Sequence, residues 1–186
     1  MTLLLLGIVL WSAAHAFKRV APGMRADLTD RFGAGPAKGF FAVLIGVSVL
    51  AMILGFRGAP FTPVYTPPSW AVHVNNLLML GAIALMGMGQ SKGRARAWLR
   101  HPMLTGFAVW AAAHLLVNGD VPSFVLFGGL GIWALVEMAV INRAEPRWTP
   151  PAKGAIAKDA MFLAASVVLL LVIGWVHTWL GYPTFG

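Results

Sequence analysis

Five histidines carry most of the chemistry that this sequence could perform: His15, His73, His101, His114 and His177. A neutral imidazole can bind haem iron, zinc or copper through a ring nitrogen. The chain has no cysteine, which excludes thiolate metal sites, disulfides and covalent attachment of haem. Any metal or haem would therefore be held non-covalently by histidine, methionine or one of the six carboxylates.

The surrounding sequence is that of a membrane protein. Hydrophobic residues make up 59% of the 186 residues and charged residues only 11%, which leaves too little polar surface for a soluble domain. Six apolar stretches are candidate transmembrane spans. We place them at about 2–17, 39–56, 69–90, 102–118, 121–141 and 159–181, and we expect a single all-α transmembrane domain over 1–186.

The basic residues fix an orientation for these spans. All but Arg57 fall in three segments, 18–38, 91–101 and 142–158, which alternate with nearly uncharged loops. Because basic loops remain on the cytoplasmic side, this pattern predicts six spans in an inner membrane with both termini periplasmic. It explains the net charge of +8 by the lipid bilayer, and we expect no nucleic-acid partner. Residues 2–17 also resemble a cleavable signal peptide, but their positive charges follow the apolar run.

This topology sorts the histidines into two layers. His73, His114 and His177 each lie about four residues, or about 6 Å, from the outer end of their span. His15 and His101 lie at inner ends, and His101 is next to Arg100 of the second basic segment. Two outer histidines from different helices would suit a six-coordinate b-type haem, and three would suit zinc if Asp120 or water completed the site.

Each histidine also has a simpler interpretation. His73 and His177 stand near tryptophans typical of a membrane interface, and His101 suits the inner headgroup layer. Glu137 is the one carboxylate inside a span, and we expect it to pair with an inner Arg or Lys, or with His101. Asp159 is the expected N-cap of the last span. Small residues, among them Gly46, Gly81, Gly87, Gly106, Ala111, Gly128 and Gly131, predict close helix packing.

Four stretches of the sequence are more specific than its composition: AAHAFKRVAPGMR, TPPSWAVH, LRHPMLTGFAVWAAAHLLVNGD and FVLFGGLGIWAL. In this order they resemble the NnrU family of bacterial membrane proteins over nearly the whole chain. The family name refers to denitrification, and the family is related to the plant 15-cis-zeta-carotene isomerase, a membrane enzyme that uses haem b.

The resemblance implies roles for individual residues. In the isomerase, two histidines stand 13 residues apart and the second binds haem, which here corresponds to His101 and His114. A cysteine three residues before that ligand corresponds to Ala111, so a redox switch through it is not expected. An earlier ligand corresponds to His15, whereas the depth argument favours His73 or His177 opposite His114.

Two hypotheses from different classes follow. The first is a haem b-binding membrane protein with a redox role, either as an isomerase of an apolar polyene or as an accessory to nitrite and nitric oxide respiration. The second is a cofactor-free structural or assembly subunit of a respiratory or photosynthetic membrane complex. The sequence identifies no catalytic residue.

Overall fold

The computed structural model describes residues 1–185, and every regular element in that part of the chain is helical. The elements are α1 (Thr2–Val20), α2 (Pro22–Phe32), α3 (Ala34–Arg57), α4 (Ala71–Met88), the short η1 (Ala95–Ala97), α5 (Pro102–Val117), α6 (Val121–Ser123), the π-helical η2 (Phe124–Gly128), α7 (Gly129–Ala144) and α8 (Ile156–Trp179). The predicted all-α class is confirmed.

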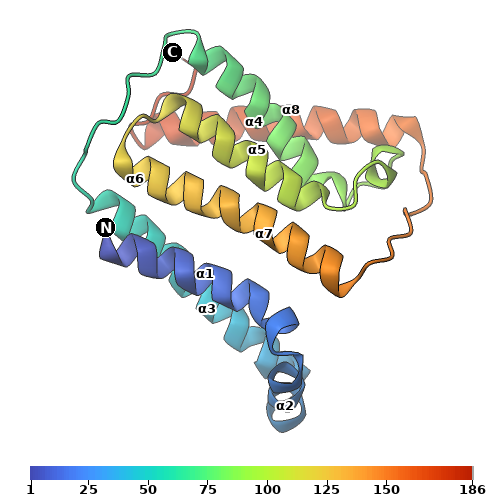
Figure 1. The fold of residues 1–186 in the computed structure, drawn as a ribbon. Helices are drawn as coiled ribbons and strands as arrows, with labels where there is room; N and C mark the ends of the chain where they lie inside the picture. Colours follow the sequence, from blue (N-terminus) through green and yellow to red (C-terminus); the bar gives the residue numbers. More distant parts are fainter. Residues whose placement is uncertain (186) are drawn as a thin grey trace.

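The helices form two packed groups that meet along α7 (Figure 1). In one group α1 lies against α3, and the short α2 connects them at one end. In the other group α4 pairs with α5, α5 also packs on α7, and α8 lies against α4. Contact between the groups runs mainly from α1 to α7 and η2, so side chains on α1, α5 and α7 can meet.

The predicted alternation of basic and uncharged ends is visible in the structure. The N- and C-terminal ends and the connection between α3 and α4 lie at one end of the bundle (Figure 1). The basic segments contain α2, η1 and the connection from α7 to α8, which lie at the opposite end. We call these the outer end and the basic end.

Within residues 1–185, five helices, rather than the predicted six, are long and apolar enough to cross a membrane. The predicted fourth span is α5, which has 16 residues and a length of about 24 Å, below the roughly 30 Å of a bilayer core. Pro102 begins α5, and the turn after Val117 ends it. The other helices end within a few residues of the predicted bounds, except that α3 begins at Ala34 instead of 39.

Three local features differ from expectation. Helix α2 lies in a segment where we expected a loop, and η2 interrupts the predicted fifth span with π-helical geometry. The N-cap assignment of Asp159 is wrong, since α8 begins one turn earlier. The Asp159 carboxylate instead accepts hydrogen bonds from the backbone N–H groups of Arg94 (2.8 Å) and Ala95 (3.1 Å). It thereby ties η1 to α8.

Glycine allows the closest helix contacts. A Cβ on Gly106 would lie 2.7 Å from the Ala82 carbonyl oxygen, so α5 can approach α4 only because this side chain is absent. Gly55, which we had not singled out, does the same for α3 against the backbone of Leu4. In contrast, Gly46, Gly81 and Gly128 face open space, so the packing role expected for them is wrong.

Candidate functional site

Three of the five histidines are held in the form that leaves a ring nitrogen free to bind a metal. In His15, His114 and His177, Nδ1 lies 2.8–2.9 Å from the backbone carbonyl one turn earlier on the same helix. The acceptors are the carbonyl oxygens of Trp11, Trp110 and Ile173. A carbonyl can only accept, so Nδ1 must carry the proton and the neutral ring keeps its lone pair on Nε2. A carbonyl partner of this kind is the usual support of a metal-binding histidine.

His114 lies in an aromatic environment near the outer end of α5. Its ring stacks on Phe127 with the centroids 4.4 Å apart and the planes 27° apart, and Trp110 is 4.9 Å away. Phe127 belongs to η2, and π-helical turns are frequent at functional sites because they shift side chains out of regular register. His177 lies near the end of α8, as His114 lies near the end of α5, and both of these helix ends are at the outer end of the bundle.

His15 stands at the other end of the same group of rings. Its ring is 4.2 Å from Trp11 on α1 and 5.0 Å from Trp133 on α7, and Phe107 touches both of those indoles. Phe107 also contacts the ring of Trp110 beside His114. We call the five connecting rings the aromatic cluster: Trp11, Phe107, Trp110, Phe127 and Trp133. The cluster links His15 to His114 and also separates them.

A buried ion pair lies toward the basic end from His15. Nη1 of Arg19 on α1 is 2.8 Å from Oε1 of Glu137 on α7, which confirms the predicted pairing of Glu137 with a basic residue of the inner segments. Arg19 lies one helical turn after His15 on α1. Glu137 lies one helical turn after Trp133 on α7, and the Trp133 ring packs against His15. The ion pair therefore closes the basic end of the aromatic cluster.

His101 and Arg100 have structural partners at the basic end. His101 Nε2 is 2.8 Å from the side-chain oxygen of Asn142, so this nitrogen is already engaged. Arg100 donates to the backbone carbonyls of Glu145 and Pro146. Both residues tie the start of α5 to the end of α7, and nothing in this geometry makes them ligands.

The residues expected to bind zinc are not gathered in one place. Among residues 1–185, no three histidine, aspartate or glutamate side chains gather closely enough to hold a metal ion. His73 is exposed on α4. Asp120, the expected fourth ligand, accepts hydrogen bonds from the backbone N–H and hydroxyl of Ser123 and caps α6. Zinc binding therefore stays a prediction that this geometry does not support.

The aromatic partners of these histidines were not predicted from the sequence. A recurring pattern would have revealed two of them, because Trp11 precedes His15 and Trp110 precedes His114 by the same four residues. Residues at this spacing lie on one helix face, so each indole packs directly against its imidazole. Trp133 and Phe127 could not be found this way, since only the packing of α7 and η2 brings them to the site.

The fold and site define a helical multi-pass membrane protein with an internal aromatic cluster between His15 and His114. The sequence profile of one family, described as NnrU protein, matches residues 3–184. The chain belongs to the NnrU family, as its sequence strings indicated. Comparison with curated proteins and with solved structures gave no match.

Proposed function

We propose that this NnrU protein binds one b-type haem in the bacterial inner membrane, with six spans and both termini periplasmic, and that it has a redox role. His114 and His177 are the residues that would hold it. The observation that carries the proposal is that both rings keep Nε2 unprotonated while they stand on different helices, each within a turn of the helix end that lies at the outer end of the bundle. Two neutral imidazoles are the donor set of a six-coordinate haem.

The chain's own residues would set the conditions around this group. The carbonyls of Trp110 and Ile173 fix the tautomer and orientation of the two imidazoles. Phe127 stacks on His114 and excludes water from that ring. A bound haem would supply an iron that can be reduced and then act as a Lewis acid or one-electron donor. The substrate we propose is an apolar polyene that enters from the bilayer, as an isomerase would need. The alternative role is electron supply to nitrite or nitric oxide respiration.

The experiment is an absorption spectrum of the detergent-purified protein before and after dithionite, with haem counted per chain. We expect a sharp reduced α-band and about one haem per chain. His114→Ala and His177→Ala should each abolish or shift this band. His73→Ala is the matched control, because His73 is exposed on α4 at the same outer end, and it should leave the spectrum unchanged.

The outcomes are distinct. Loss of the band in His15→Ala together with an unchanged band in His177→Ala would assign the second ligand to His15 and overturn the pair proposed here. A flat spectrum after expression with added haem would overturn haem binding altogether and favour a cofactor-free assembly subunit. If haem is present, incubation of the reduced protein with a cis-polyene and separation of its isomers would test the isomerase role.

A further inference from the structure

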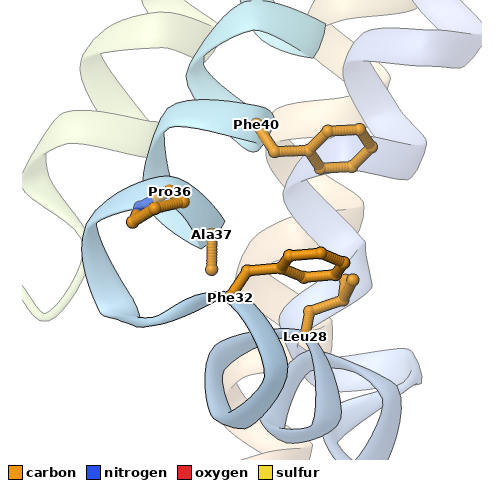
Figure 2. A pocket seen from close by; sticks show the side chains of 5 residues that line it. All are labelled: Leu28, Phe32, Pro36, Ala37 and Phe40. Carbon is orange, nitrogen blue, oxygen red and sulfur yellow. The ribbon is translucent and has the colours of Figure 1, made fainter.

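An apolar groove at the basic end of the bundle is formed where α2 folds back beside the start of α3. Leu28 and Phe32 of α2 line it from one side, and Pro36, Ala37 and Phe40 of α3 line it from the other (Figure 2). The rings of Phe32 and Phe40 extend to the same side of α3 with a gap between them. The groove has a volume of about 330 Å³, which is enough for part of an acyl chain.

The groove is continuous with the face of α3 that contacts lipid. Phe40, Val43, Val47, Leu50 and Leu54 are all exposed, and their spacing places them on one helix face. Exposed apolar side chains along a membrane-spanning helix face the bilayer. An acyl chain held between Phe32 and Phe40 could therefore run along α3 toward the membrane interior without leaving an apolar surface.

Helix α2 is built to lie at the membrane surface. It has 11 residues and none of them is buried, so it neither spans the bilayer nor belongs to the core. Met24, Leu28 and Phe32 recur every four residues and form one apolar face, of which Met24 is 61% and Phe32 63% exposed. The amphipathicity of α2 is weak, but its exposure and its flanking charges suit the headgroup layer at the membrane surface.

The two arginines of α2 lie nearer to its apolar face than the two aspartates do. At about 100° per residue, Arg25 and Arg31 each lie about 60° from the centre of the apolar face, whereas Asp27 and Asp30 lie about 100° and 160° away. The guanidinium of Arg25 is fixed 3.9 Å above the ring of Phe41 on α3.

Lys38 is next to Ala37 of the groove. Arg31 and Asp27 line an adjoining hollow that shares Leu28 and Phe32 with the groove. Arg25, Arg31 and Lys38 therefore outnumber the single carboxylate beside these two hollows.

We propose that the groove between α2 and α3 binds one anionic phospholipid. Its acyl chain lies between Phe32 and Phe40, and its phosphate lies beside Arg31 and Lys38. The site is separate from the proposed haem ligands, so it can be tested whether or not haem is bound.

The test uses native mass spectrometry of the full chain in detergent with added phosphatidylglycerol or phosphatidylcholine. We expect one retained phosphatidylglycerol and little phosphatidylcholine. The double substitution Arg31→Gln and Lys38→Gln should weaken retention by about fivefold for each charge removed. Arg147→Gln with Lys153→Gln is the matched control, because it removes two exposed charges at the same end but away from the groove.

A second variant tests the apolar part of the site. Phe40→Ala removes one wall of the groove at an exposed position and should cause loss of the retained lipid, whereas Leu169→Ala, exposed on α8, should not. Glycerol phosphate, which has the charge but no acyl chain, should not compete. Three results would overturn the proposal: equal loss of retained phosphatidylglycerol in the two double variants, equal retention of phosphatidylglycerol and phosphatidylcholine, or competition by glycerol phosphate.

Discussion

Replacing Glu137 by Gln would test whether the ion pair with Arg19 holds α1 against α7. The two side chains are 21% (Arg19) and 8% (Glu137) exposed, and their charged atoms are 2.8 Å apart. At an effective dielectric constant of about 20, the gross attraction at this distance is about 6 kcal/mol, much of which offsets the loss of hydration. Breaking a buried pair by removing one partner costs about 3–5 kcal/mol.

The two single substitutions should lower the unfolding free energy by different amounts. Glu137→Gln leaves Arg19 partly exposed to water and facing an amide that can still accept a hydrogen bond, so we expect a loss of about 2–3 kcal/mol of unfolding free energy. Arg19→Gln leaves the more buried carboxylate without a cation and should cost about 3–4 kcal/mol. The double substitution should cost less than the sum, because neither charge then remains unpaired.

The assay is unfolding by denaturing detergent, followed by circular dichroism of the purified protein. Glu145→Gln is the matched control, since Glu145 is exposed at the end of α7 and its side chain has no ion-pair partner within residues 1–185. Equal effects of Glu137→Gln and Glu145→Gln, or a double variant whose loss equals the sum of the single losses, would show that the ion pair does not hold α1 against α7.

Three further predictions concern packing, a loop and pH. Gly106→Leu should destabilise the protein by about 1–3 kcal/mol or more, because any Cβ there collides with α4. Asp159→Ala should cost about 1–2 kcal/mol, because it leaves two backbone N–H groups of the basic-end loop unpaired. Burial raises the pKa of the Tyr65 hydroxyl above its ordinary value of 10.0, and this hydroxyl donates to the Leu115 carbonyl. The folded state therefore holds the proton more tightly, so this contribution to stability is complete below pH 10 and is lost as the pH rises through the folded pKa. Tyr65→Phe should remove that alkaline loss.

The same unfolding assay measures all three, with a control for each. Gly81→Leu adds the same side chain in open space on α4 and should not destabilise the protein. Asp30→Ala removes an exposed carboxylate of α2 and should have a similarly small effect. For Tyr65, Tyr182→Phe on the exposed C-terminal segment should leave the alkaline profile unchanged. Each prediction is supported if the test variant changes the measured stability more than its control does. Equal changes in the two variants contradict it.

Several features were predictable because they depend on local sequence. Apolar runs of adequate length must become helices in a bilayer, since every backbone group there needs an internal partner. Pro102 set the start of α5, and the grouping of Lys and Arg set which helix ends lie together. The partner of Glu137 was predictable as a class, because an isolated carboxylate inside a span is costly.

Other features depended on contacts between distant segments. Asp159 was expected to cap its own helix, but its carboxylate accepts hydrogen bonds from the backbone N–H groups of residues 94 and 95 instead. The outer histidines were grouped by their depth along each helix. Depth does not tell which way a side chain points around the helix axis. Depth places His73 level with His114, but only packing decides which rings face inward, and His73 faces out.

Composition, charge order and the family strings are local properties of the chain, so they identified a helical membrane protein of the NnrU family without any structure. The contacts of three imidazoles with a carbonyl four residues earlier are also local to one helix. In contrast, only the fold brings His15 and His114 to one aromatic cluster and forms a groove between α2 and α3. Helix rotation and the packing of α1, α5 and α7 place side chains from distant segments in contact, and no periodicity within one helix encodes that contact.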